Sequence, residues 1–148
     1  MKPRTVQAYA LLLASKDKAV QRQVRRCLLT GGLSPRGLTI ARDEPQWQEA
    51  LNRQRPRLVM LDDGIAPGNG VVLLDALRRR LPEVLTVYLA EQHTAELERT
   101  VRQLGVLYYT EKPAEESALE RVLAAVFSTE SPSPSVPSTL AGITFTPR

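Results

Sequence analysis

The chain has 148 residues, of which 43% are hydrophobic, 24% charged and 5% aromatic, and its formal net charge is +4. This length suits one globular domain, and the ordinary apolar fraction excludes a chain that is disordered throughout. A single cysteine and a single histidine exclude internal disulfides and metal sites built from several cysteines or histidines. With one histidine, the chain also offers few possible sets of nucleophile, histidine and acid for a hydrolase.

Charge is unevenly distributed along the sequence. Residues 1–60 contain 12 Lys and Arg against 4 Asp and Glu, and residues 61–148 contain 8 against 12, so the balances are +8 and −4. A basic half is compatible with nucleic acid or an acidic partner, but no nucleic-acid-binding motif accompanies it, so we favour a solvated basic helix face. Residues 1–10 lack a secretory signal, and no apolar run reaches the ~18–20 residues of a membrane helix. We therefore expect a cytoplasmic protein without membrane segments.

Apolar runs alternate with amphipathic segments along most of the chain. Short continuous apolar runs are typical of strands buried on both faces, and five occur, at residues 9–14, 38–41, 58–61, 84–90 and 106–110. Segments with apolar residues at helical spacing follow each run, which predicts helices over residues 17–30, 43–55, 71–81, 94–104 and 114–127. Asp17 and Asp43 are predicted helix caps. This alternation with short connections predicts one α/β domain, in which a parallel sheet is covered by helices on both faces.

The composition changes at residue 128. Of the 21 residues 128–148, 13 are Ser, Thr or Pro and only two are charged. Such a segment buries too little apolar surface to offset the entropy of ordering it. We therefore predict a domain over residues 5–127 and a linker or tail over residues 128–148. Within the tail, residues 139–148 are open to two interpretations, a short docking strand or the stump of a longer chain.

Polar residues follow four of the predicted strands. Parallel strands end at one edge of a sheet, where sites form, and the residues delivered there are Ser15, Lys16 and Asp17, then Asp62 and Asp63, then Glu91, and finally Glu111 and Lys112. A carboxylate at this edge is a candidate nucleophile toward phosphate, with an ammonium group to neutralise the developing charge. An Asp–Lys pair that only stabilises the crevice is equally consistent with the pattern.

Three pieces of sequence resemble the receiver domain of two-component response regulators: Arg57-Leu58-Val59-Met60-Leu61-Asp62, Gly70 eight positions further on, and Lys112-Pro113. The resemblance covers roughly residues 5–127. It implies a flavodoxin-like (βα)5 fold with strand order 2-1-3-4-5. It also implies transfer of a phosphoryl group to an aspartate at the end of the third strand, with Mg²⁺ bound.

Carried over residue by residue, the resemblance makes Asp62 the phosphoacceptor and Lys112 the phosphate-binding lysine. Tyr109 would be the switch aromatic that changes rotamer on activation, and the peptide bond before Pro113 would be cis. The family's proline after the acceptor lies one place late, at Pro67, which leaves Asp63 as an alternative acceptor. Spacing from the strand and from the glycine at position 70 favours Asp62.

Two chemical elements of the family's site are replaced in this chain. Receivers hold Mg²⁺ through a pair of acids after the first strand, where this sequence has Ser15 and Lys16. Because Mg²⁺ is usually held through carboxylates, we predict no metal site and no cofactor, with Mg²⁺ needed only if Asp62 accepts phosphate. The hydroxyl residue that ends the fourth strand in the family is Leu89 here, which cannot bond a phosphoryl group. The site resembles that of a degenerate receiver, or pseudo-receiver.

We predict a receiver-type signalling module of a two-component or phosphorelay system. It would act as a protein-interaction or dimerisation domain and not as an enzyme, with little or no Mg²⁺-dependent phosphorylation. The alternative is a phosphoaccepting response regulator that catalyses its own phosphorylation and dephosphorylation at Asp62. A basic nucleic-acid-binding domain using residues 1–60 is the less favoured third reading.

The expected partner is a protein, either a sensor kinase or a downstream regulator. The resemblance also implies a homodimer surface formed by the fourth helix, the fifth strand and the fifth helix. That surface carries charges of both signs, which suit reciprocal salt bridges across a twofold axis: Glu96, Glu98, Arg99, Arg102, Glu115, Glu116 and Arg121.

Overall fold

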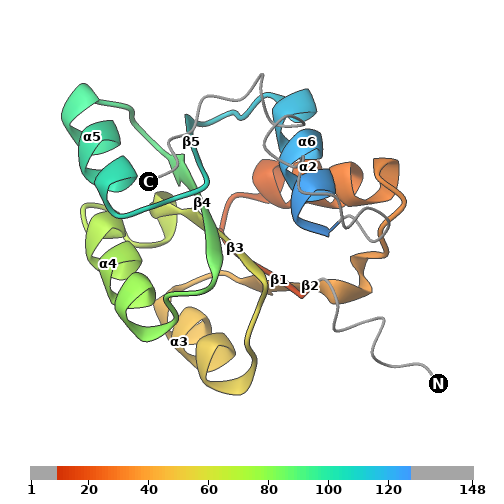
Figure 1. The fold of residues 1–148 in the computed structure, drawn as a ribbon, viewed down its shortest axis with the longest axis horizontal. Helices are drawn as coiled ribbons and strands as arrows, with labels where there is room; N and C mark the ends of the chain where they lie inside the picture. The colour runs from red at the N-terminus through yellow and green to blue at the C-terminus, as the bar shows by residue number, and fades with distance from the viewer. Residues whose placement is uncertain (1–9, 128–148) are drawn as a thin grey trace.

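Five parallel strands form a sheet between two layers of helices in the computed structural model, which describes residues 10–127 (Figure 1). The strands are β1 (Leu11–Ala14), β2 (Leu38–Ala41), β3 (Leu58–Asp62), β4 (Leu85–Ala90) and β5 (Tyr108–Glu111). Their order is β2-β1-β3-β4-β5, and every neighbouring pair is parallel. The predicted flavodoxin-like topology is confirmed.

Five helices cover the two faces of this sheet. They are α2 (Lys18–Thr30), α3 (Glu44–Arg53), α4 (Gly70–Arg80), α5 (Ala95–Gln103) and α6 (Glu116–Phe127), with short 3₁₀ turns at η1 (Pro35–Gly37) and η2 (Asp63–Ile65). Figure 1 shows α2 and α6 together on one face and α3, α4 and α5 on the other. The arrangement follows from right-handed crossovers between parallel strands.

Side-chain alternation along the strands divides the core into two clusters. Leu12 and Val59, for example, pack with Trp47 of α3 on the face covered by three helices. Leu11 and Leu13 point the other way, toward α2 and α6. All residues of β1 and β3 are buried, as expected for central strands of a sheet covered on both sides.

Polar side chains begin the helices where the sequence predicts them. Asp17 accepts a hydrogen bond from the amide of Ala19 at 2.9 Å, and Asp43 accepts one from the amide of Gln46 at 2.9 Å. The fifth strand begins at Tyr108, two residues later than the apolar run. Residues 106 and 107 instead complete the turn after Gly105, whose φ of +89° favours glycine.

Some predicted features lie outside the described residues. These are the first residues of the predicted domain and of its first strand, together with the whole segment 128–148. Across residues 10–127, no helix combines the length and the apolar character that a membrane crossing requires.

Candidate functional site

Asp62 ends β3 at the carboxyl edge of the sheet and is only 1% exposed. Its Oδ2 accepts hydrogen bonds from the Ser15 hydroxyl at 2.7 Å and from the Lys112 ammonium at 3.0 Å. Its Oδ1 accepts one from the amide of Gly64 at 2.9 Å. A buried carboxylate is stable only when it is paired and hydrogen-bonded, and these three donors supply both conditions.

Lys112 is the cation at the centre of the site. Its Nζ lies 3.0 Å from Asp62, 3.2 Å from Asp17 and 2.8 Å from Glu91. Its burial lowers the pKa of the ammonium group, but the hydrogen bonds to the three carboxylates outweigh that effect and raise the pKa above its ordinary value. The peptide bond between Lys112 and Pro113 is cis.

Asp17 caps α2 and also contacts the site. Burial raises the pKa of its carboxyl, but the hydrogen bond from Lys112 and the amide of Ala19 outweigh this effect, so the pKa is lowered from its ordinary value. The sequence placed this residue at the sheet edge and explained it as a helix cap. The contact with Lys112 depends on the approach of β5 to the start of α2, which periodicity does not reveal.

Ser15 and Lys16 occupy the two positions after β1 where the resemblance calls for acids. Ser15 is fully buried, and its hydroxyl both donates to Asp62 and accepts the amide of Asp17 at 3.1 Å. Gln21 of α2 donates to the Ser15 carbonyl at 2.9 Å, which holds this turn in place. Lys16 lines the cavity at the sheet edge, whose volume is about 700 Å³ and whose wall also includes Asp62, Gly64 and Lys112.

Asp63, the alternative acceptor, is engaged elsewhere. Its Oδ2 accepts the Tyr88 hydroxyl at 2.8 Å, and its Oδ1 accepts the amide of Glu91 at 2.8 Å. Burial, with Asp63 as the next contribution, raises the pKa of Tyr88 well above its ordinary value, so the phenol remains a donor. These hydrogen bonds connect the loop after β3 with the end of β4, so Asp63 has a structural role.

The acidic side chains at this edge of the sheet are engaged by other groups of the protein. Ligand atoms of Asp62, Asp63 and Glu91 all lie within 4.8 Å of one another. However, the Lys112 ammonium contacts Asp62 and Glu91 directly, and each oxygen of Asp63 accepts one hydrogen bond from the protein. Mg²⁺ demands free hard oxygen ligands in octahedral geometry, and a lysine at position 16 adds repulsion.

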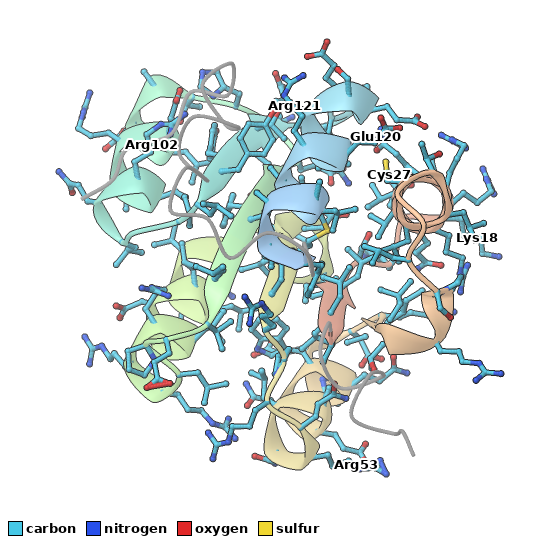
Figure 2. All side chains as sticks on the ribbon, turned by 45° about the vertical axis from the view of Figure 1, so that its right-hand side comes forward. Lys18, Cys27, Arg53, Arg102, Glu120 and Arg121 are labelled. Atoms are coloured by element: carbon cyan, nitrogen blue, oxygen red, sulfur yellow. The ribbon has the colours of Figure 1, made fainter. Side chains whose placement is uncertain are left out.

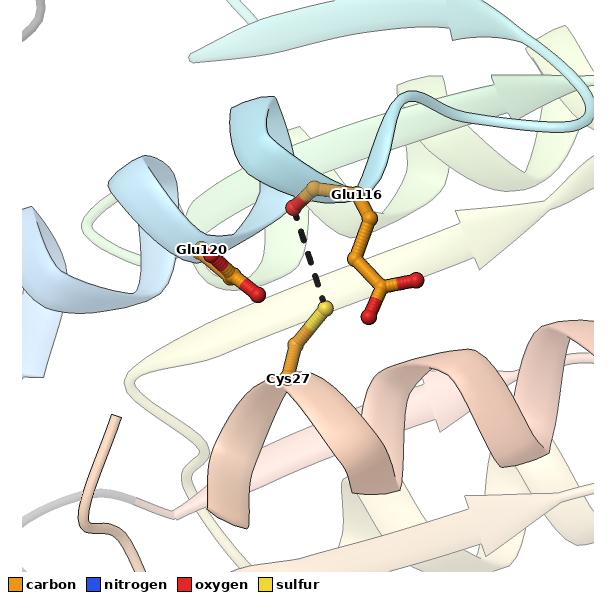
Figure 3. Close-up of side chains that lie close together, drawn as sticks. All are labelled: Cys27, Glu116 and Glu120. Carbon is orange, nitrogen blue, oxygen red and sulfur yellow. Dashed lines mark hydrogen bonds between the residues drawn. The ribbon is translucent and has the colours of Figure 1, made fainter. Parts of the chain in front are cut away.

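A second group of metal-ligating types lies between α2 and α6. Figure 3 shows Cys27 with Glu116 and Glu120, and the Cys27 thiol contacts the Glu116 carbonyl oxygen at 3.9 Å. Burial and the nearby carboxylates raise the pKa of Cys27 to about 12, so the thiol is neutral at physiological pH. The Glu116 carboxylate pairs with Arg26 at 2.9 Å. This cluster is a helix–helix contact.

Two residues of β4, Leu89 and Thr86, bear on whether the site contains the hydroxyl that the resemblance calls for. Leu89 is buried at the end of β4, directly beside Asp62 in the sheet register, and presents no hydroxyl. Thr86 lies earlier in β4, and its buried hydroxyl has no hydrogen-bond partner among the described residues. It is fully buried and does not line the cavity, so its hydroxyl does not substitute for one at position 89.

Tyr109 is turned inward and is 5% exposed. Its ring stacks on that of Tyr88 with centroids 6.0 Å apart, and its hydroxyl lies 2.8 Å from Nδ1 of His93. The guanidinium of Arg102 lies 5.8 Å from the ring centroid. Burial, followed by Glu98, raises the pKa of Tyr109 to about 12. Three neighbours therefore contact this aromatic side chain in its inward position.

Sequence reasoning missed three contributors to the site. Glu91 was placed at the sheet edge without a partner, Tyr88 lay within an apolar run, and no role was assigned to His93. Alternation along β4 puts Tyr88 on the same face as Ala90, but the hydroxyl's reach to Asp63 needs tertiary geometry. No local signal predicts the bond between His93 and Tyr109.

The predicted dimer surface is partly used within the chain. Glu98 pairs with Arg102 at 2.8 Å on α5, and Glu116 pairs with Arg26 of α2. Glu96, Arg99 and Glu115 remain exposed. Fewer charges than predicted are therefore available for reciprocal salt bridges.

Comparisons with known proteins identify the fold. No family model matches the chain, and no curated protein matches it by sequence. Among solved structures, a receiver domain from Colwellia psychrerythraea aligns with a TM-score of 0.71 at 16% identity, covering 82% of this chain and 99% of that one. An orphan response regulator of H. pylori aligns with a TM-score of 0.69 at 16% identity, covering 82% and 98%.

A third structure represents the phosphorylated form of such proteins. It is a response regulator from Burkholderia pseudomallei with a phosphorylated aspartic acid and a calcium ion, aligned with a TM-score of 0.66 at 16% identity over 90% of this chain and 72% of that one. The strand order, the Asp62–Lys112 pair and these alignments agree with one another. The chain therefore has the receiver fold of the response regulators.

Proposed function

We propose that the protein is a signalling module that works through protein interaction, without Mg²⁺-dependent phosphorylation. The observation that carries this proposal is the environment of Asp62. The Ser15 hydroxyl, the Lys112 ammonium and the Gly64 amide all donate to its carboxylate, and Lys16 adds a second cation at the cavity wall. A phosphoryl donor would meet a carboxylate with three of its about four lone pairs engaged, beside a residue pair, Ser15 and Lys16, that supplies no carboxylate for Mg²⁺.

The experiment is intact-mass analysis after incubation with acetyl phosphate, with and without Mg²⁺. We expect no metal-dependent phosphoryl adduct on the wild-type protein. The variant Ser15→Asp/Lys16→Asp restores the missing carboxylates, and we expect it to gain an adduct only when Mg²⁺ is present. This positive control shows that a negative wild-type result is caused by the replaced acids.

A metal-dependent adduct on the wild-type protein would overturn the proposal. Asp62→Ala and Asp63→Ala, run in parallel, would then identify the acceptor. This outcome favours the second candidate function, an autophosphorylating response regulator with Asp62 as nucleophile. The observation that supports this second candidate function is the cavity beside Asp62 and Lys112, which gives a phosphoryl donor access to them.

We further propose that Tyr109 holds the α5–β5 surface in a single arrangement, without a phosphoryl signal. Its inward position, with the His93 bond and the Tyr88 stack, supports this role. Partner binding, by a sensor kinase, a downstream regulator or a second copy of the chain, would then use a preformed surface. The exposed Glu96, Arg99 and Glu115 are the charges that such a contact would engage.

A double-mutant cycle tests the hydrogen bond between His93 and Tyr109. We expect His93→Ala and Tyr109→Phe each to lower the free energy of unfolding, with a coupling of about 1 kcal/mol, because both remove the same bond. Urea titration monitored by Trp47 fluorescence measures the four stabilities. Hydrogen exchange of α5 amides should quicken in both single variants but not in Arg99→Ala, a solvent-exposed control on α5. Additive effects, with α5 exchange unchanged, would contradict a role for this bond.

A further inference from the structure

The exposed side of α2 is strongly and uniformly basic. The helix contains four Lys and Arg and no Asp or Glu. Lys18, Arg22 and Arg25 follow one another at spacings of four and three residues, so they lie along one line on the helix surface. Leu29, four residues further on the same line, is 62% exposed. We call these four residues the α2 stripe.

The α2 stripe points away from the core. The buried side of the helix consists of Val20, Gln21, Val24, Cys27 and Leu28. In Figure 2, Lys18 lies at the right-hand edge of the molecule, where α2 faces outward. Lys18, Arg22 and Arg25 are all exposed and, among residues 10–127, none of them takes part in an ion pair. The next cation on the helix, Arg26, does have a partner, Glu116.

This charge pattern opposes the stability of the isolated helix. Arg22 faces Lys18 four residues before it, Arg25 three residues after it and Arg26 four residues after it, and like charges at these spacings repel. Lys18 also lies in the first turn, where the helix dipole disfavours cations. A stripe that disfavours its own helix and has no counter-ion within residues 10–127 has the electrostatics of a binding surface.

The shape of the stripe indicates its occupant. Its three cations span about 10 Å and the whole stripe about 16 Å, at the rise of an α-helix. A second helix packed along α2 can present carboxylates at the same spacing and an apolar residue opposite Leu29. Nucleic acid binds mainly through its phosphates and would gain nothing from the exposed leucine. A membrane surface would need more apolar area than one leucine supplies.

We propose that α2 binds an acidic α-helical segment of a protein partner through Lys18, Arg22, Arg25 and Leu29. The inference rests on the proposed function only in taking the chain to be a protein-interaction module. Variants on the stripe leave Ser15, Asp62 and Lys112 unchanged, so this experiment and the acetyl phosphate experiment fail independently of each other.

The probe is a fluorescent helical peptide with three glutamates and one leucine at the spacing of the stripe. We expect Arg22→Gln/Arg25→Gln to weaken its binding about tenfold. The control Arg42→Gln/Arg55→Gln makes the same change in net charge at two exposed positions outside α2, and its affinity should equal that of the wild type. Leu29→Ala should weaken binding of this peptide but not of poly-L-glutamate. Binding should also fall between about 50 mM and about 200 mM NaCl.

Thermal stability provides a second measurement. If the stripe only stabilised the fold, its loss would lower the Tm. Because Arg22→Gln/Arg25→Gln removes repulsion within the helix, its Tm should rise by about 2 °C while peptide binding falls. Three results would each overturn the proposal: no peptide binding at low salt, equal loss in the two double variants, or tighter binding of a DNA duplex or of phosphatidylserine vesicles than of the peptide.

Discussion

Replacing Lys112 with methionine is expected to destabilise the fold by about 3 kcal/mol, because it removes the cation from a buried carboxylate. Asp62 is 1% exposed, and Lys112 is its only ion-pair partner among residues 10–127. The substitution also removes the ammonium group that contacts Asp17 and Glu91 as well as Asp62. Urea unfolding followed by Trp47 fluorescence measures the effect, since Trp47 is the only tryptophan and is buried.

Lys16→Met is the matched control. It makes the same change in charge at the wall of the same cavity, but Lys16 has no ion pair among the described residues. We expect its stability to lie within about 0.5 kcal/mol of the wild type, as for most exposed substitutions. Similar effects of the two substitutions would mean that net charge at the cavity, and not the contacts of Lys112, stabilises the site.

The difference between the wild type and Lys112→Met should depend on pH. The pKa of Asp17 is lowered in the folded protein by Lys112, so this carboxyl contributes stability above its unfolded pKa and loses it as pH falls through the folded value. The pKa of Lys112 is raised, so its contribution is present at neutral pH and is lost only on strong alkalinisation. The deficit of the variant should therefore be constant near neutrality and shrink below about pH 4.

Gly70→Ala is expected to cost about 3 kcal/mol, which is at the upper end of overpacking penalties. Gly70 begins α4, and a Cβ built on it would overlap the Tyr88 hydroxyl and the Cβ of Asp63. The overlap would break the hydrogen bond that connects the end of β4 with the loop after β3. The gain in helix propensity from glycine to alanine, about 1 kcal/mol, offsets only part of this cost.

Gly31→Ala is the control for this substitution. A Cβ at Gly31 would lie 3.5 Å from the Cys27 carbonyl oxygen, an ordinary contact, and its φ of −85° suits any residue. Its unfolding free energy should stay within about 0.5 kcal/mol of the wild type. Thermal unfolding of both variants gives the comparison, and a Gly70→Ala protein as stable as Gly31→Ala would show that Tyr88 can move without loss.

Most of the fold prediction rested on the spacing of apolar residues along the chain. Continuous apolar runs such as residues 58–61 are typical of central parallel strands, and the helices begin at Asp17 and Asp43 because their side chains cap free amides. Strand order came from the resemblance around Asp62 and Lys112, because the apolar runs of the five strands are alike in character. The ends of β5 and α4 differ from the predicted ends, since turns at Gly105 and Leu81 depend on tertiary packing.

The sequence by itself determined the α/β class, the edge of the sheet where Asp62 and Lys112 meet, and the replacement of the acid pair by Ser15 and Lys16. The first two conclusions depend on local spacing and on the rule that parallel strands end together, and the third depends on the resemblance to receiver domains. Only the tertiary structure decided that Ser15 donates to Asp62, that Tyr88 donates to Asp63, and that His93 forms a hydrogen bond with Tyr109. Each of those bonds joins side chains from different elements, whose distances depend on how helices and strands pack and not on the order of residues along the chain.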